Sequence, residues 1–313
     1  MTGKHATPPA APDRDPQFAD LLARARTRPP TATAVAWPLT ADALAGPLDA
    51  AAEGLIEPWL IGPEGGIRAL AERESLDLSA CRLIDIADPV RAAMHCAALA
   101  RDREVGAIMK GSLHTDELMA AVVARESGLR TARRISHAFV MGVPGHPRLL
   151  MITDAAVNIA PDLETKRDIV QNAIELAHAL GVPAPRVALL AAVEIVTPKM
   201  PATLDAAALC KMADRGQITG GVLDGPLALD NALSDESART KGIVSQVAGR
   251  PDILVAPDIE AGNMLYKQLV FFTGAFAAGL VLGAKVPVIL TGRADGRDSR
   301  VASCALARLA TGS

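Results

Sequence analysis

Short runs of apolar residues alternate along the chain with longer segments in which apolar residues recur every three or four positions. The uninterrupted runs at 105–109 and 286–290 are typical of strands that are buried on both faces of a sheet. The segment 163–180 places Ile169, Ala173 and Leu176 on one face, as an amphipathic helix does. Strands and helices therefore alternate, which predicts an α/β fold with a parallel sheet and helices on both of its faces.

The same pattern gives the order of the elements. We predict helices at 17–27, 41–54, 64–74, 89–101, 117–126, 163–180, 205–215, 264–283 and 299–309. We predict strands at 34–37, 57–61, 82–86, 105–109, 138–143, 148–153, 187–193, 219–223, 253–256 and 286–290. The most apolar run of the chain, 269–284, is shorter than a membrane span and contains glycines, so we interpret it as part of a buried or interface helix.

Local signals fix two of these elements more closely. Asp88 followed by Pro89 is the pattern of an N-cap and first helical residue. The turn at 144–147 (PGHP) separates two apolar runs and predicts a hairpin, which would make the sheet mixed.

The length of the chain favours two domains. Its 313 residues exceed what one hydrophobic core usually serves. We expect residues 16–150 and 286–313 to form a discontinuous first α/β domain and residues 151–285 to form a second α/β domain. Residues 1–15 are polar and rich in proline, without the apolar core of a signal peptide, and we expect them to be a disordered tail.

Composition narrows the class of partner. Half of the residues are apolar, only 3% are aromatic, and the net charge is −3. Because there is no overall basic bias, we expect neither nucleic acid nor membrane as a partner, although a few local arginines can still bind a small anion. The four cysteines are scattered, which is typical of reduced thiols in a cytoplasmic protein.

Polar loops adjoin several of the predicted strands, where ligands bind in α/β proteins. Four such loops lie at 110–116, 133–137, 153–162 and 292–298, and a fifth at 257–263 precedes the helix that carries Tyr266 and Lys267. Backbone amides at the start of the helix after Gly111, with Lys110, Ser112 and Thr115, could hold a phosphate; the alternative is an ordinary turn before a capped helix. His114 and His137 are candidate acids or bases, or structural histidines.

The last loop concentrates charge. Arg293 could bind phosphate in a bidentate manner or stabilise a developing oxyanion, while Asp295 or Asp298 could accept a proton. The alternative is a surface cluster whose ion pairs contribute under about 1 kcal/mol each. The sequence contains no metal-ligand spacing, no GxSxG elbow, no Walker A motif and no GxGxxG fingerprint.

These loops, taken in order, resemble a known family. The segments that carry the resemblance are KGSLHTDELM (110–119), RRISHAFVM (133–141), ITDAAVNIAPDLETKRDIVQNAIELAHALG (152–181), GPLALDNALS (225–234), AGRPDILVAPDIEAGNMLYKQL (248–269) and VPVILTGRAD (286–295). They are similar to the phosphate acetyltransferase and phosphate butyryltransferase family from about residue 50 to the end of the chain.

The resemblance implies a reaction and an architecture. It implies reversible transfer of an acetyl or short-chain acyl group, of the butyryl type, between coenzyme A and inorganic phosphate, with coenzyme A as a substrate and no tightly bound cofactor or metal. It implies two α/β domains with a cleft between them, similar to isocitrate and isopropylmalate dehydrogenases, and a homodimer formed through the second domain.

It also implies a set of site residues. Arg293 matches the arginine of the family's last loop, and Asp298, or else Asp295, matches its aspartate. The residues expected to bind coenzyme A, phosphate or the acyl group are Lys110, Ser112, His114, Thr115, Arg133, Ser136, His137, Thr153, Asp154, Asn158, Asn263, Tyr266, Lys267 and Gly292. The resemblance leaves open which of Arg133, Arg134, Arg148 and Arg297 joins Arg293 at the phosphate.

Two positions depart from the family's pattern. Gly292 stands where the family usually has serine, and neither Thr291 nor Ser299 is at the matching position. Loss of one transition-state hydrogen bond can cost about 2–4 kcal/mol, so an alternative is a catalytically weakened module that binds acyl-CoA. Met119 stands where acetyl-specific members tend to carry arginine, which favours the butyryl-type branch or the related domains that are fused to hydratases. A decarboxylating dehydrogenase of similar architecture would need metal-binding aspartates and a nicotinamide loop, and the sequence shows neither.

Overall fold

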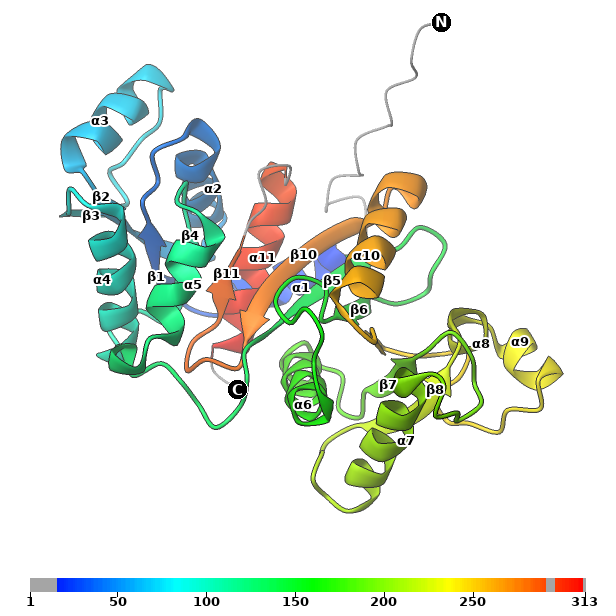
Figure 1. The fold of residues 1–313 in the computed structure, drawn as a ribbon. Coiled ribbons are helices and arrows are strands. Elements are labelled where there is room, and N and C mark those ends of the chain that lie inside the picture. The colour runs from blue at the N-terminus through cyan, green and yellow to red at the C-terminus, as the bar shows by residue number, and fades with distance from the viewer. Residues whose placement is uncertain (1–15, 291–295, 312–313) are drawn as a thin grey trace, which may run out of the picture. The chain divides into compact units, whose positions relative to one another are not determined.

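The computed structural model describes residues 16–290 and 296–311, which divide into two compact units (Figure 1). Residues 134–277 form the middle unit, and the segments on either side of it together form the flanking unit. Each unit contains both strands and helices, so the chain has the predicted α/β character.

The flanking unit is built mainly from the first third of the chain. Its elements from that part are α1 (Pro16–Arg26), β1 (Thr31–Ala36), α2 (Ala41–Ala52), β2 (Ile56–Gly62), α3 (Glu64–Arg73), β3 (Arg82–Asp85), α4 (Pro89–Arg101), β4 (Ala107–Lys110), α5 (Thr115–Val123) and the 3₁₀ turn η2 (Arg125–Ser127). The strand β10 (Phe276–Leu282), which begins at the end of the middle unit, is followed by β11 (Val288–Ile289) and α11 (Arg297–Ala310).

The strand order in the flanking unit is β3-β2-β1-β4-β11-β10. The pairs from β3 to β11 are parallel, and β11 with β10 is antiparallel. The C-terminal strand therefore returns beside β4, with Ile289 level with Met109. The α4 helix begins as its sequence predicts, because the Asp88 carboxylate accepts a hydrogen bond of 2.8 Å from the backbone N–H of Arg91, next to Pro89 at the first helical position.

The middle unit contains the elements that follow Arg133. These are β5 (Ser136–Gly142), β6 (Leu150–Thr153), α6 (Leu163–Ala179), β7 (Arg186–Leu190), α7 (Pro201–Asp214), β8 (Val222–Leu227), α8 (Leu229–Leu233), α9 (Asp235–Thr240), β9 (Ile253–Val255) and α10 (Ile259–Thr273). Their strand order is β5-β6-β9-β7-β8. The β5–β6 pair is antiparallel, which confirms the predicted hairpin and the mixed sheet.

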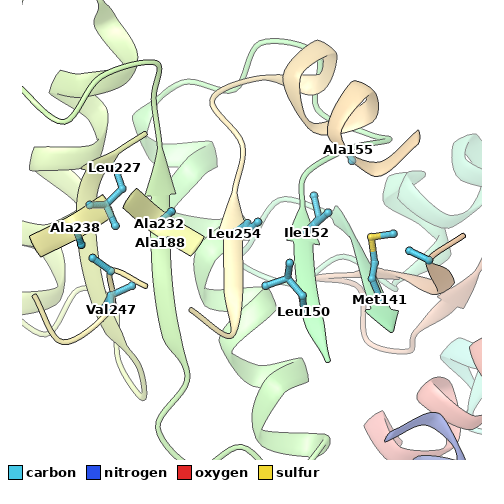
Figure 2. Close-up of a cluster of buried hydrophobic side chains, with 12 residues drawn as sticks. Met141, Leu150, Ile152, Ala155, Ala188, Leu227, Ala232, Ala238, Val247 and Leu254 are labelled. Carbon is cyan, nitrogen blue, oxygen red and sulfur yellow. The ribbon is translucent and has the colours of Figure 1, made fainter. Parts of the chain in front are cut away.

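Buried apolar side chains from the sheet of the middle unit form a hydrophobic core. Figure 2 shows Ile152 of β6 and Leu254 of β9 on neighbouring strands, with Met141 of β5 beyond them. These side chains are almost fully buried. Burying each one stabilises the fold by about 1.5–3 kcal/mol relative to leaving it exposed, which fixes the strands whose ends carry the polar loops.

The predicted helix at 264–283 is wrong. The α10 helix ends at Thr273, and Gly274 follows it in the left-handed conformation with φ of +69°. The chain then forms β10, whose residues Phe276–Leu282 are apolar almost throughout. A continuous apolar run of this kind fits a buried strand as well as a helix, and Gly274 is the residue that separates the two.

The predicted strand at 219–223 has the wrong bounds, because β8 begins at Val222 and continues through Asp224, Gly225 and Pro226. A β-carbon on Gly225 would lie 2.7 Å from Cβ of Leu189, so only glycine allows this approach to β7. Proline is tolerated here because β8 is the last strand in the order and, among the described residues, pairs on one side only.

Candidate functional site

The β4 and β11 strands finish at the same end of the flanking sheet. Lys110 ends β4, and Leu290 follows β11, whose parallel register sets Ile289 level with Met109. Parallel strands that end together bring the following loops side by side. Lys110 and Leu290 therefore lie at the same end of the sheet.

The Lys110 loop is held by the residue that follows β1. The backbone N–H of Ser112 and its hydroxyl both donate to the carbonyl oxygen of Trp37, at 2.9 and 2.7 Å. The Ser112 hydroxyl also accepts from the N–H of Leu39 at 3.2 Å. A β-carbon on Gly111 would lie 2.6 Å from the Trp37 carbonyl oxygen, which leaves room only for glycine. Ser112 thus positions the loop in this structure.

The next residues start α5 with an exposed amino end. His114 is the N-cap, and its backbone N–H donates to the Glu117 carboxylate at 2.9 Å. The side chains of His114 and Thr115 are exposed at this helix start. The Lys110 ammonium donates to the carbonyl oxygens of Gly111 and Leu113 at 3.2 and 3.4 Å, so it stays beside the loop. The backbone N–H groups at this helix start are compatible with both interpretations, a capped turn and a site that binds an anion.

In the middle unit, Asp154 organises the loop after β6. Its carboxylate accepts hydrogen bonds from the backbone N–H groups of Ala156, Val157 and Asn158 at 2.9–3.1 Å. The Asn158 side-chain amide adds a fourth hydrogen bond of 2.6 Å. Asp154 is only 2% exposed. This carboxylate is fully engaged by its own loop and acts as its structural centre.

His137 lies beside that carboxylate on β5. Its side chain is 2% exposed, and its Nδ1 has no hydrogen-bond partner in the described part of the chain. Burial lowers the pKa of His137 to about 4, against an opposing effect of the Asp154 charge. The imidazole is therefore neutral at physiological pH. Its ring lies 4.3 Å from that of Phe139, which in turn stacks on Tyr266 at 3.8 Å between centroids.

The remaining predicted residues of the middle unit bind mostly backbone. Thr153 donates from its hydroxyl to the His137 carbonyl at 2.9 Å. Asn158 donates to the carbonyl of Ile135 at 2.9 Å, and Asn263 to that of Ala155 at 3.1 Å. Lys267 is exposed on α10. The structure thus brings His137, Thr153, Asp154, Asn158, Asn263 and Tyr266 together around the start of β5, the end of β6 and the first half of α10.

Sequence reasoning missed two buried polar residues of α6 that support this cluster. Asn172 donates to the Arg134 carbonyl at 3.0 Å and to the Ser136 hydroxyl at 2.9 Å. Asp168 accepts from the backbone N–H of Arg134 at 2.9 Å. Both lie on the inner side of α6 and are at most 5% exposed. The signal was available, because Asp168 and Asn172 are spaced i, i+4 and break an apolar helix face.

The candidate arginines are held by different contacts. Arg148 pairs with Asp252 at 3.4 Å, and Arg297 pairs with Asp49 at 2.9 Å. Arg133 is half-buried just before β5, and Arg134 is exposed, with its backbone fixed by α6. Asp298 lies in the first turn of α11 and is half-buried. Gly292, Arg293 and Asp295 lie outside the described residues.

The buried, neutral state of His137 predicts a pH dependence of stability. The pKa is about 4 in the folded chain and 6.5 without burial, so the unfolded chain binds the extra proton as the pH falls below 6.5. We expect the free energy of unfolding to fall by about 2 kcal/mol between pH 7 and pH 5 through this group, with no contribution above pH 7. Urea unfolding of the wild type and of His137→Gln at both pH values measures it. An equal loss in both proteins would contradict this prediction.

In residues 16–290 and 296–311, no three or more His, Cys, Asp or Glu side chains are grouped so that they could hold a metal ion. Within the same ranges, no helix is both long enough and apolar enough to cross a membrane.

Comparison with known proteins decides the family. The model of the phosphate acetyl/butaryl transferase family matches residues 85–308. The chain belongs to this family. It is 58% identical to a phosphate acetyltransferase of Rhizobium meliloti over 301 residues, which cover 96% of this chain and 94% of the relative. It is 42% identical to a phosphate butyryltransferase of Clostridium beijerinckii, over 93% of this chain and 97% of that protein.

Solved structures agree with that assignment. A branched-chain phosphotransacylase from Enterococcus faecalis superposes with a TM-score of 0.79 at 28% identity, over 90% of this chain and 99% of that chain. A 4-hydroxythreonine-4-phosphate dehydrogenase from Klebsiella pneumoniae, at 16% identity and a TM-score of 0.55 over 90% of this chain and 98% of that chain, shares the fold alone. The resemblance found in the sequence is confirmed, and the protein is an acyltransferase.

Proposed function

We propose that this acyltransferase catalyses the reaction acyl-CoA + phosphate = acyl phosphate + CoA, with an acetyl or short-chain acyl group. The observation that carries the proposal is family membership over residues 85–308, which include every predicted site residue. The parallel β4 and β11 strands support it, since Lys110 and Leu290 lie at the same end of the flanking sheet.

We infer a direct transfer between the two substrates. In the direction of CoA acylation, the thiol loses its proton to the Asp298 carboxylate, with Asp295 as the alternative base. The sulfur then forms a bond to the acyl carbon, and the bond between that carbon and the phosphate oxygen breaks. Arg293 stabilises the oxyanion and the departing phosphate. Because the free thiol is weakly acidic, a nearby base or cation is needed to raise its thiolate fraction.

We infer that Arg133 or Arg134 joins Arg293 at the phosphate. Asp168 and Asn172 anchor the backbone of Arg134 beside the polar loops of the middle unit, which supports this choice. We infer that Lys110 and the exposed start of α5, with His114 and Thr115, bind a further anionic group of a substrate.

In the middle unit, we infer that the cluster of His137, Phe139 and Tyr266 contacts the less polar part of a substrate, because its rings stack and its histidine is neutral. Ser136, Thr153, Asp154, Asn158 and Asn263 hold the loops around it through their hydrogen bonds. Lys267 is exposed on α10 and offers a charge to a phosphate of coenzyme A.

A thiol-release assay tests the function. Purified protein is mixed with acyl-CoA thioesters of two to five carbons, with and without inorganic phosphate, and free CoA is measured. We expect phosphate-dependent release for at least one chain length. Absence of phosphate-dependent release with all of them would reject the proposal.

The weakened module is the second candidate, and Gly292 is the observation that favours it. If the enzyme is tuned to work with glycine, Gly292→Ser is expected to change kcat by less than about tenfold, since Arg293 and the base already carry the reaction. The assay above compares the two proteins. A module without turnover predicts binding of acyl-CoA in calorimetry with no CoA release in the wild type and little in Gly292→Ser.

We also propose a homodimer formed through α10. Met264, Phe271 and Phe272 are 67%, 68% and 86% exposed and fall on one side of this helix, where a second copy would cover them. Phe272→Asp is expected to convert the dimer to a monomer in size-exclusion chromatography with light scattering. The control is Val244→Asp, at another exposed apolar residue outside α10, which should remain dimeric. A wild-type monomer, or a dimeric Phe272→Asp, would contradict this interface.

Three further features follow from the family and stay proposals. The two compact units are the two α/β domains of an architecture similar to isocitrate and isopropylmalate dehydrogenases. The enzyme works in the cytoplasm, in keeping with its unpaired cysteines. Coenzyme A is a substrate that is released, and no cofactor or metal is tightly bound.

A further inference from the structure

A cavity of about 430 Å³ opens in the flanking unit between α4, α5 and η2. This volume is within the range of small-molecule pockets. The α4 and α5 helices pack against each other beside it (Figure 1). None of the residues that line it belongs to the site proposed for acyl transfer. The cavity is therefore separate from the residues assigned to acyl transfer.

One wall of the cavity is apolar. Ala97 and Ala98 of α4 face it from one side, and Ala121 of α5 with Ala124 from the other. Alanine side chains are short, and so they leave a groove between the helices that a larger apolar group can fill. Met94 lies at the same cavity and is 51% exposed. Covering this surface would bury apolar area that is now in water.

The other part of the lining is basic. Arg91, His95 and Arg101 all come from α4. In the part of the chain that the structure describes, the side chains of Arg91 and His95 have no hydrogen bond and no ion pair. Arg101 is held by Asp102, with two bonds of 2.8 and 2.9 Å. Glu126 is the acidic side chain in the lining, and no ion pair joins it to Arg91 among the described residues.

We propose that this cavity binds a small organic anion with an apolar body. Its carboxylate or phosphate group would accept hydrogen bonds from Arg91 and His95, one helical turn apart. Its apolar part would lie on the alanine wall and against Met94. The proposal goes beyond acyl transfer, because it assigns a second ligand to a face that the reaction does not use.

The probe for the test is anilinonaphthalene sulfonate, an amphipathic anion that fluoresces when it leaves water. The full chain is titrated with the probe in the presence of saturating coenzyme A, which occupies the acyl-transfer site. We expect one saturable site per chain. We expect octanoate and phenyl phosphate to displace the probe, and the stronger competitor of the two shows which anionic group the cavity prefers. We expect neutral octanol to displace the probe much more weakly.

Variants locate the binding. The double variant Arg91→Ala, His95→Ala is expected to weaken probe binding by about tenfold or more, as loss of a charge-assisted contact should. Ala98→Phe is expected to remove binding by filling the groove. The control is Arg73→Ala, an arginine of α3 that pairs with Glu74 outside the cavity. Phosphate-dependent CoA release should stay at the wild-type rate in the double variant.

The outcomes separate the two proposals. Binding that coenzyme A abolishes, or that the double variant and Ala98→Phe both leave unchanged, would overturn the second site and leave acyl transfer untouched. Absence of CoA release in the wild type, with probe binding lost in the double variant, would overturn the proposed function and leave the second site. Circular dichroism of each variant shows whether it is folded.

Discussion

Arg293→Ala is expected to lower kcat by about 10³-fold and to leave the fold intact. Arg293 is the arginine of the last loop that matches the family, and removal of one group that stabilises the transition-state oxyanion costs about 3–4 kcal/mol. The loss should appear in kcat more than in KM, because the interaction strengthens as charge develops on the oxygen. The measurement is the phosphate-dependent release of CoA at saturating substrate.

The control for this variant lies four residues further along. Arg297 is exposed at the start of α11 and pairs with Asp49 at 2.9 Å, an ion pair that also raises the pKa of its guanidinium. Arg297→Ala should keep kcat within about threefold of the wild type, since an exposed ion pair contributes about 1 kcal/mol or less to stability and none to the reaction. A near-full rate in Arg293→Ala, or an equal loss in both variants, would mean that Arg293 is not the stabilising group.

Asp154→Asn is expected to destabilise the protein by about 2–4 kcal/mol and to lower its activity with it. The carboxylate accepts three backbone N–H groups and the Asn158 amide in a buried place. An asparagine has one acceptor oxygen, and its NH₂ group would face donors. The loop after β6 would lose hydrogen bonds that hold its backbone in place. Urea unfolding gives the stability, and CoA release gives the activity.

The matched control is Asp162→Asn at the N-cap of α6. Its carboxylate accepts a hydrogen bond of 2.8 Å from the backbone N–H of Thr165, and asparagine caps helices about as well as aspartate. This variant should change the free energy of unfolding by less than about 0.5 kcal/mol. If Asp154→Asn kept full stability and lost all activity, Asp154 would be a reacting group and the structural role assigned here would be wrong.

Elements with local signals were predictable from the sequence. The start of α4 follows from Asp88 and Pro89, and the β5–β6 hairpin follows from the turn between two apolar runs. The helix at 264–283 failed because periodicity cannot separate a buried helix from a buried strand in an apolar run. The left-handed Gly274 decides that point, and its conformation depends on the structure around it.

The candidate site was predictable in its residues more than in their roles. The polar loops after β4 and β6 were visible as breaks in the pattern, and the family resemblance supplied the reaction. The sequence could not show that the Asp154 carboxylate accepts hydrogen bonds from its own loop, or that the Ser112 hydroxyl donates to the Trp37 carbonyl. Contacts between residues far apart in the chain, such as that of Asn172 with Ser136, are set by packing and leave only a weak local signal.

The central claim is that the acyl group moves from coenzyme A to phosphate. The most direct measurement quantifies free thiol and acyl phosphate, trapped as the hydroxamate, in the same reaction with butyryl-CoA or acetyl-CoA. We expect the two products to form in a one-to-one ratio, and both to require inorganic phosphate. Thiol release that continues without phosphate, or that yields no acyl phosphate, would show hydrolysis instead and would contradict the account.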